Sequence, residues 1–382
     1  MKRQLMSFHQ LYFMYPDELV YIVALNKVFR YNPKVSNFLM KEFGSAEAIF
    51  RLDKSVLMEI FNKSYRFFDQ LSDSSILSWA KEEISWAETK GVRLIHINDS
   101  AYPASLKECF DPPLILYLYG DANLNQEKII SIVGTRMSTK YGTECCRKII
   151  RELLDYGCSP VIVSGLAYGV DVASHKAALE FGLRTVAVLP NGLDRIYPTA
   201  HHEIAKKISR QGAVLSEFPR ATESLKINFI QRNRLIAALS KATIVIESRE
   251  KGGALITAEL AQSYSREVFA LPGRVSDPIS SGCNKLIFRN IATIFSSTKD
   301  FISLMGWSPE NKHITNSKKQ LFYSGSPEKE KILVALRINS ELNMDELLLI
   351  TGTRMQSLCE SLLELELEGY IHSLAGKRYS LA

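Results

Sequence analysis

Short runs of β-branched and other apolar residues alternate with helix-length segments between residues 92 and 302. The runs are VRLIHI (92–97), LILYLYG (114–120), IISIVG (129–134), PVIVSG (160–165), RTVAVLP (184–190), AVLSE (213–217), ATIVIES (242–248) and EVFALPG (267–273). Parallel strands need helical crossovers, so this alternation predicts an α/β fold with a mostly parallel sheet and helices on both faces. The carboxyl ends of such strands meet at one edge, where open α/β sheets bind ligands.

Helical patterns flank this region, which we assign to residues 91–302. In residues 1–90, apolar residues recur at three- and four-residue spacings, which predicts a small helical domain. Residues 303–326 are polar and contain Pro and Gly, which is typical of a linker. Residues 327–382 carry three helical segments and then two short β-like pieces around a Gly-Lys turn, which predict a winged-helix-like domain.

Composition limits the class of protein. With 382 residues, 46% of them hydrophobic and 23% charged, the chain is typical of a folded protein with several domains. Its net charge of +6 permits a polyanionic partner without demonstrating one. The six cysteines form no C-x-x-C pair, which predicts reduced thiols, no zinc site and a cytoplasmic setting. We expect no signal peptide and no membrane partner, because His9, Pro16 and Asp17 interrupt the first apolar stretch and no later run could span a bilayer.

The first candidate binding segment follows IISIV and reads Gly134-Thr135-Arg136-Met137-Ser138-Thr139-Lys140-Tyr141-Gly142. It is not G-x-G-x-x-G, so it does not indicate a dinucleotide site. Glycine permits a tight turn, the following helix offers free amides, and Arg136 could clamp a phosphate. The alternative is a helix capped by Ser138 or Thr139 with an exposed arginine.

Two further strand ends carry turn residues. One reads Ser164-Gly165-Leu166-Ala167-Tyr168-Gly169-Val170-Asp171, and the other contains Asn191-Gly192. Glycines at such turns let the backbone approach a ligand closely. Asp171 and His175 share a helix face, but no further ligand has a suitable spacing, so local hydrogen bonding is favoured over a metal site.

Cations and an aromatic residue gather in Lys226-Ile227-Asn228-Phe229-Ile230-Gln231-Arg232-Asn233-Arg234. A base could stack on Phe229 while Lys226 and Arg232 or Arg234 hold phosphates. The alternative is an amphipathic helix start with Phe229 buried and the cations solvated.

A glycine pair in Lys251-Gly252-Gly253-Ala254 follows ATIVIES, where it is either a backbone anion cradle or a simple corner. The recurrence of such turns at one edge predicts a pocket for more than one phosphate. The chain has no G-x-S-x-G elbow, no Walker lysine and no paired-histidine metal motif. We therefore expect no catalytic residue, no metal and no cofactor.

Seven blocks of the sequence, in order, closely resemble the DNA processing protein A family, also called Smf. They are IVGTRMSTKYG (132–142), VSGLAYGVDVASHKAAL (163–179), VLPNGLDRIYP (188–198), LSEFP (215–219), FIQRNRLIAALSKATIVIES (229–248), KGGALITAELA (251–261) and FALPGRVSDPISSGCNKLI (269–287). The resemblance implies an extended Rossmann-like domain between a small helical domain, of the SAM or helix-hairpin-helix kind, and a winged-helix domain. It also implies a homodimer, not an enzyme, that binds single-stranded DNA without sequence preference. Such a protein loads a RecA-type recombinase during natural transformation and recombination, against competition from single-strand-binding protein.

The resemblance implies a positively charged pocket built from Gly134, Thr135 and Arg136 and from the Lys226 and Phe229 pair. Many members have Arg where this chain has Tyr168, so one cation is replaced by an aromatic ring. The full set of residues expected to contact DNA is Gly134, Thr135, Arg136, Ser138, Lys140, Tyr141, Ser164, Gly165, Tyr168, Gly169, Asn191, Gly192, Lys226, Phe229, Arg232, Asn233, Arg234, Gly252 and Gly253.

Two other functions fit parts of the sequence. Nucleotide phosphoribohydrolases on a related fold use P-G-G-x-G-T-x-x-E, and Glu259 stands at the spacing of that glutamate, but Leu255 and Ile256 replace the Gly-Thr pair. A sequence-specific regulator could act through the winged helix, but the segment 356–368 carries four glutamates, which suits a protein contact better than a DNA groove.

Overall fold

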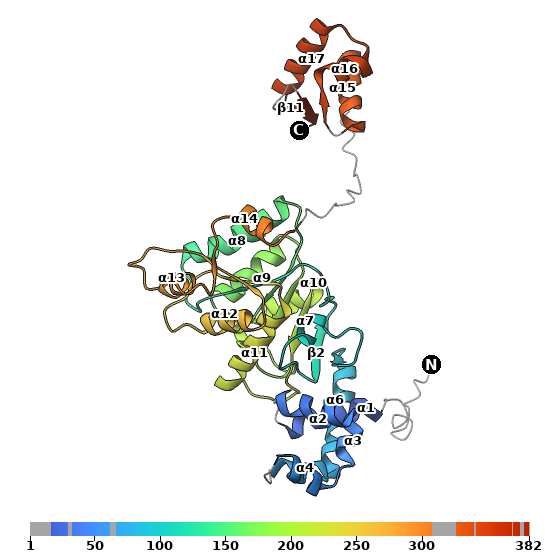
Figure 1. Cartoon of the computed structure of the whole chain (residues 1–382), viewed down its shortest axis with the longest axis vertical. Coiled ribbons are helices and arrows are strands. Elements are labelled where there is room, and N and C mark those ends of the chain that lie inside the picture. The colour runs from blue at the N-terminus through green and yellow to red at the C-terminus, as the bar shows by residue number, and fades with distance from the viewer. Residues whose placement is uncertain are drawn as a thin grey trace. The chain divides into compact units, whose positions relative to one another are not determined.

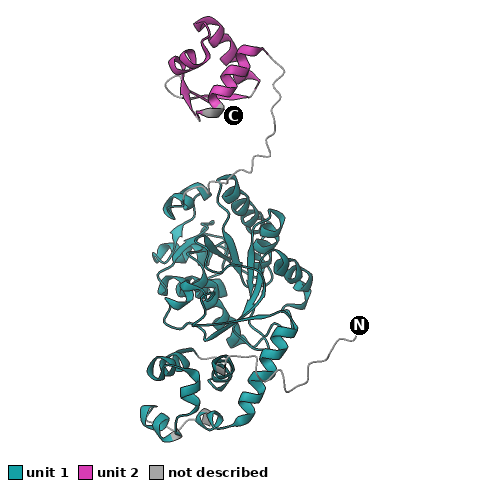
Figure 2. Ribbon diagram, turned by 90° about the vertical axis from the view of Figure 1, so that its right-hand side faces the viewer, with its two compact units in different colours: residues 1–310 teal, residues 311–382 magenta. Residues whose placement is uncertain are grey.

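The computed structural model describes residues 17–29, 33–61, 66–307, 326–339, 341–368, 370–374 and 378–381. The chain divides into two compact units, residues 1–310 and residues 311–382 (Figure 2). Most of the predicted linker, residues 308–325, lies outside the described residues. The predicted domain boundaries within and between these units stay predictions.

A nine-stranded sheet organises the first unit, with the strand order β1-β2-β6-β5-β4-β3-β7-β8-β9. Its strands are β1 (Arg93–His96), β2 (Ile115–Gly120), β3 (Ile129–Val133), β4 (Val161–Ser164), β5 (Thr185–Val188), β6 (Ala213–Ser216), β7 (Ala242–Val245), β8 (Glu267–Ala270) and β9 (Thr293–Ile294). All pairs from β6 to β9 are parallel, whereas β2 is antiparallel to both β1 and β6. The predicted mostly parallel sheet is confirmed, and each predicted run contains a strand. The two-residue β9 is too short to have been recognised.

Helices cover both faces of this sheet (Figure 1). They are α7 (Ala104–Lys107), α8 (Lys140–Asp155), α9 (Val170–Glu180), η2 (Thr199–His201), α10 (His202–Gln211), α11 (Lys226–Leu239), α12 (Gly253–Ser263), α13 (Ser281–Phe288) and α14 (Thr298–Leu304). Successive β3 side chains point to opposite faces: Ile129 and Val133 pack with α11 and α12, and Ile130 and Ile132 pack with α8 and α9. The sheet is therefore buried on both sides, which explains why its strands are apolar throughout.

The order of the strands creates a crevice at one place in the sheet. From β3 the chain moves outward through β4 and β5 to β6, and it then returns to place β7 on the other side of β3. The connections after β3 and β7 therefore diverge at the carboxyl edge. Open α/β sheets bind ligands at such a switch point.

The N-terminal helices pack against the β2 side of the sheet. They are α1 (Asp17–Val28), α2 (Pro33–Phe43), α3 (Ala46–Phe50), α4 (Lys54–Phe61), α5 (Arg66–Leu71) and α6 (Ser74–Thr89). Their core is continuous with Leu114, Ile115 and Tyr117. Buried Glu83 of α6 accepts the backbone N–H of Arg220 at 2.8 Å, so these helices are joined to the loop after β6.

The second unit has the helical and strand content predicted for a winged helix. It contains α15 (Pro327–Ile338), β10 (Leu342–Asn343), α16 (Met344–Thr351), α17 (Met355–Leu367), β11 (Ile371–Leu374) and β12 (Arg378–Leu381), and its three strands pair in the order β10-β12-β11. Leu347, Leu358 and Leu362 belong to its own hydrophobic core. None of the helices in the described part of the chain is long and apolar enough to cross a membrane.

Candidate nucleic-acid interface

A pocket of about 640 Å³ opens at the switch point of the sheet. Residues after β3, residues after β7 and the first turns of α11 and α12 line it, together with parts of the loops after β4 and β5. The lining comprises Val133, Gly134, Thr135, Arg136, Ala167, Asp171, Tyr197, Ser224, Lys226, Phe229, Ile230, Arg232, Asn233, Ile236, Ser248, Arg249, Lys251, Gly252, Gly253, Ala254, Ile256 and Thr257. The structure thus brings together the predicted turn at Gly134, the Lys226 and Phe229 pair and the Gly252-Gly253 corner.

The lining is strongly cationic. Arg136, Lys226, Arg249 and Lys251 are exposed at its surface, and Asp171 is the one carboxylate among the described lining residues. Clefts lined by one sign of charge raise the local concentration of oppositely charged ligands. The pocket is therefore suited to an anion with several charges.

Phe229 provides an apolar platform among these charges. Its ring is half-buried and meets the Tyr197 ring edge to face, with centroids 5.5 Å apart. The guanidinium groups of Arg136 and Arg232 lie over it at 5.1 and 5.9 Å from the centroid. An aromatic ring beside cations can hold a base and its phosphates together.

Arg232 lines the pocket, but it is buried, whereas a residue that clamps a phosphate would have to reach solvent. Its side chain is 3% exposed and donates hydrogen bonds to the carbonyls of Gly165 and Val188. Burial lowers the pKa of this guanidinium to about 10, and nearby Asp171 opposes the shift. A side chain at Gly165 would collide with the guanidinium, which explains why glycine is needed there. Arg232 therefore supports the pocket floor, and its prediction as a phosphate clamp is corrected.

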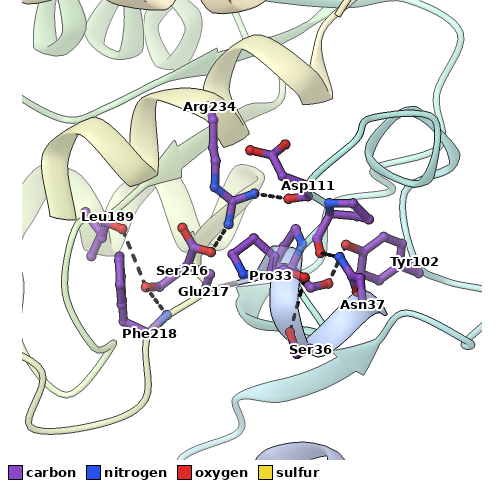
Figure 3. Close-up of polar contacts among 12 residues, drawn as sticks. Pro33, Ser36, Asn37, Tyr102, Asp111, Leu189, Ser216, Glu217, Phe218 and Arg234 are labelled. Atoms are coloured by element: carbon purple, nitrogen blue, oxygen red, sulfur yellow. Dashed lines mark hydrogen bonds and ion pairs between the residues drawn. The ribbon is translucent and has the colours of Figure 1, made fainter. Parts of the chain in front are cut away.

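Arg234 is buried and does not line the pocket, and its guanidinium is directed toward Asp111 and Glu217 (Figure 3). It donates to the Asp111 carbonyl at 2.5 Å and forms an ion pair with buried Glu217. The Asp111 carboxylate accepts the hydroxyl of Tyr264 at 2.7 Å. This network joins α11 to the segment before β2, so the prediction that Arg234 holds DNA phosphates is corrected.

The amino terminus of α8 already holds a carboxylate of the chain itself. Buried Glu247, which follows β7, accepts the backbone N–H of Thr139 at 2.9 Å and its hydroxyl at 2.5 Å. A side chain at Gly142 would collide with this carboxylate. The predicted anion site at α8 is thus filled from within, because a helix amino terminus stabilises any nearby negative charge. Ser138, Lys140 and Tyr141 belong to this segment and do not line the pocket.

The amino terminus of α12 remains available to a ligand. Gly252 is its N-cap, without a side-chain cap, and Gly252, Gly253 and Ala254 all line the pocket. The first amides of a helix have no acceptor within the helix. The predicted cradle at the glycine pair therefore lies where the helix dipole can attract a phosphate.

The other predicted residues organise the loops around the pocket. Ser164 is buried and donates to the Ile132 carbonyl at 2.7 Å, and Asn191 is buried and donates to the carbonyls of Gly192 and Arg195, each at 2.8 Å. These hydrogen bonds hold the Ser164 and Asn191 side chains inside the protein. The expectation that the backbone at Ser164, Asn191 and Gly192 contacts DNA stays a prediction.

Gly169 and Tyr168 lie beside the pocket rather than in its lining. Gly169 has a φ of +74° and packs on the backbone of Thr135 and Arg136, so it needs glycine for its conformation. The Tyr168 ring is exposed. His175 is buried, with its Nδ1 2.6 Å from the Thr185 hydroxyl, and the described residues hold no cluster suited to a metal ion.

Several lining residues, among them Arg249, Lys251 and Tyr197, were not in the set expected to contact DNA, although Lys251 begins the segment quoted for the glycine pair. Arg249 and Lys251 flank the connection between β7 and α12, and Tyr197 precedes a proline in the loop after β5. Cations in the connection between a parallel strand and the next helix were a usable signal for Arg249 and Lys251. No pattern in the sequence indicated that Tyr197 would reach Phe229.

A cationic pocket at the switch point of a Rossmann-like sheet defines an anion-binding protein of the doubly wound class. The family model described as DNA recombination-mediator protein A matches residues 93–306, and that of the DprA winged helix domain matches residues 320–377. The chain therefore belongs to the DNA recombination-mediator protein A family, which confirms the resemblance and the winged-helix prediction.

Several relatives share much of the chain. DNA processing protein DprA of Bacillus subtilis (strain 168) is 39% identical over 216 residues, which are 56% of this chain and 72% of that protein. The X-ray structure of DNA processing protein A from Streptococcus pneumoniae matches with a TM-score of 0.58 at 30% identity, over 74% of this chain and 97% of that one. A structure of DNA processing protein A from Helicobacter pylori, described for its single-stranded DNA binding mode, matches with a TM-score of 0.50 at 34% identity, over 56% and 95%.

Proposed function

We propose that the pocket binds single-stranded DNA without sequence preference. The observation that carries this proposal is the convergence of four exposed cations, the Phe229 ring and the uncapped start of α12 on one pocket. Cations and helix amides bind the phosphate backbone, and an aromatic ring stacks with any base. Neither contact reads sequence. The described binding mode of the Helicobacter pylori relative supports the same ligand.

A titration of fluorescent single strands tests this proposal. Arg136→Ala and Lys226→Ala should each reduce the slope of log affinity against log salt by about 0.7, because each removes one phosphate contact. Phe229→Ala should weaken binding about tenfold through lost stacking. Lys90→Ala is the matched control, since Lys90 is an exposed cation after α6 that does not line the pocket.

Duplex competition and salt dependence decide the outcome. The proposal fails if duplex DNA binds as tightly as random single strands, or if affinity does not depend on salt. It also fails if Lys90→Ala changes the slope as much as the pocket variants do.

We further propose that the chain acts as a homodimer that loads a RecA-type recombinase onto DNA in transformation and recombination, against single-strand-binding protein. The family description as a recombination mediator supports this role. The β9 edge supports self-association, because Ile294 on it is 48% exposed and Phe288 just before it is 87% exposed. Strand-exchange assays with and without the chain, on DNA coated with single-strand-binding protein, test the loading step; no stimulation would contradict it.

We propose that the pocket binds without catalysis. Glu259, the residue at the spacing of the hydrolase glutamate, is exposed on α12 and does not line the pocket. Incubation with nucleoside monophosphates should release no free base, and release would favour the hydrolase instead. The exposed Glu360 and Glu364 of α17 support a protein contact for the winged helix rather than sequence-specific DNA binding.

A further inference from the structure

A second hollow, of about 740 Å³, lies between α9 and α10 and outside the pocket described above. Lys176 and Glu180 of α9 and Lys207 and Arg210 of α10 line it, over a floor that includes Leu179 and Ile204. We call this hollow the α9–α10 groove. No residue lining it belongs to the predicted site.

The α9–α10 groove carries a net positive charge. Lys176, Lys207 and Arg210 are exposed. The single carboxylate in its lining, Glu180, is held by Arg147 of α8, whose Nε donates to both carboxylate oxygens at 3.0 and 3.1 Å. The negative charge of Glu180 is therefore already matched, and the three cations remain to attract an anion.

The two helices that form the groove begin at the same edge of the sheet as the pocket. Both follow the carboxyl ends of parallel strands, β4 and β5, so both run away from the pocket edge. Gln211 at the end of α10 donates to the carbonyls of Ala178 and Leu183, at 3.2 and 2.6 Å, and so joins the far ends of the helices. The groove therefore lies toward the carboxyl ends of both helices, which Gln211 holds together.

Tyr168 lies at the edge of the sheet where the pocket opens and where both helices of the groove begin. It follows Ala167, which lines the pocket, and precedes the start of α9. Its ring is 51% exposed and rests on His201, the N-cap of α10, with centroids 4.8 Å apart at 62°. The Nδ1 of His201 donates to the Leu166 carbonyl at 2.7 Å, and Leu166 has a φ of +59°. An aromatic ring is thus held in solvent at the point where both helices begin.

We propose that single-stranded DNA leaving the pocket stacks a base on Tyr168 and then continues along the α9–α10 groove, with its phosphates on Lys176, Lys207 and Arg210. This proposal rests on the proposed function of the pocket. Exposed rings and cations in series are the features by which proteins follow a single strand. An acidic protein in the groove is the alternative that the test must separate.

Binding by oligonucleotides of two lengths tests the track. One oligonucleotide, of about five nucleotides, is short enough for the pocket alone, and the other has about twenty. The full chain is compared with a variant combining Lys176→Ala, Lys207→Ala and Arg210→Ala, and with a control combining Lys90→Ala, Lys241→Ala and Lys299→Ala. The control removes the same charge from exposed cations that line neither hollow.

The track predicts a length-dependent effect. Between 50 and 200 mM salt, three phosphate contacts account for roughly a 20-fold loss of affinity, at a slope of about 0.7 per phosphate. For the long strand, the groove variant should therefore lose about 20-fold less affinity than the wild type over this salt range. For the short strand, the two should bind equally well. Tyr168→Ala should weaken long-strand binding about tenfold, and Tyr168→Phe should not.

The outcomes distinguish this inference from the proposed function. If neither oligonucleotide binds the wild-type chain, the pocket proposal itself fails. If both bind and the groove variant retains the wild-type affinity and salt slope for the long strand, the track is wrong and the groove is left to a protein partner. Equal losses from the groove variant and the charge-matched control would also overturn the track.

Discussion

The Glu247 carboxylate, two residues after β7, holds Thr139, the N-cap of α8, and its removal is a direct test of how that helix start is stabilised. Glu247 is 2% exposed and accepts two hydrogen bonds from Thr139, one from the backbone N–H and one from the hydroxyl. Glu247→Gln keeps the shape and removes the charge. The amide oxygen can still accept the Thr139 N–H, and the NH₂ group can donate to the Thr139 hydroxyl oxygen, so both hydrogen bonds remain possible but become neutral ones.

The expected loss of stability is about 2 kcal/mol. A hydrogen bond to a charged group contributes about 1.5–3 kcal/mol and a neutral one about 1 kcal/mol. A charge at a partly buried helix terminus adds up to about 2 kcal/mol. The desolvation of the carboxylate, which the variant avoids, offsets part of this gain. The direction is therefore destabilising.

Urea unfolding followed by tryptophan fluorescence measures this loss. Trp307 packs in the same core cluster as α8 and reports on it. Glu259→Gln, on the exposed face of α12, is the matched control and should change stability by less than about 0.5 kcal/mol. A Glu247→Gln chain as stable as the control, with an unchanged denaturant slope, would show that the carboxylate does not hold α8.

Three other perturbations give separate tests. Gly165→Ala places a methyl group against the buried Arg232 guanidinium and should lower the free energy of unfolding by about 1–3 kcal/mol. Gly253→Ala is the control and should change it little, because nothing lies within 4 Å of a side chain at that position. Equal unfolding midpoints for the two variants would contradict the close contact between Gly165 and Arg232. Burial lowers the pKa of His175 from its usual 6.5 to about 3. As the pH falls from 6.5 toward 3, this histidine is therefore protonated in the unfolded chain but not in the folded one. The free energy of unfolding should fall over that pH range by up to about 1.4 kcal/mol per pH unit. A His175→Gln chain with the same pH dependence in urea unfolding would argue against this. Phe288→Asp should shift the proposed homodimer toward monomer in sedimentation experiments. A wild-type chain that is already monomeric would refute the proposal that the β9 edge mediates dimerisation.

Much of the fold follows from local pattern. The apolar runs locate the strands because a strand buried on both faces must be apolar throughout. Parallel topology then fixes which loops share an edge, and so it predicts that Gly134, Lys226 and Gly252 lie near one another, as they do. The antiparallel β2 was not indicated, since an apolar run carries no information about direction.

The roles of individual cations were harder to predict from the sequence than the fold was. Lys226, Phe229 and Asn233 recur at three- and four-residue spacing and share the pocket face of α11, whereas Arg234 falls outside it. The periodicity alone does not exclude Arg234, however, because it stands four residues after Ile230, which also lines the pocket. In contrast, Glu247 reaches Thr139 across 108 residues of sequence, and only the pairing of β3 with β7 brings them together. Contacts of this kind are set by tertiary structure alone.

The guanidinium of Arg136 lies over the ring of Phe229, at 5.1 Å from its centroid. An incoming base and this guanidinium compete for the same aromatic surface, so stacking requires the arginine to move aside. The displaced cation regains a partner only if the ligand also carries a phosphate within reach. A free nucleobase or nucleoside supplies none, and it should be a poor ligand however well its ring would fit. One side chain would then make the pocket discriminate against bases and nucleosides in favour of ligands that carry a phosphate beside the base.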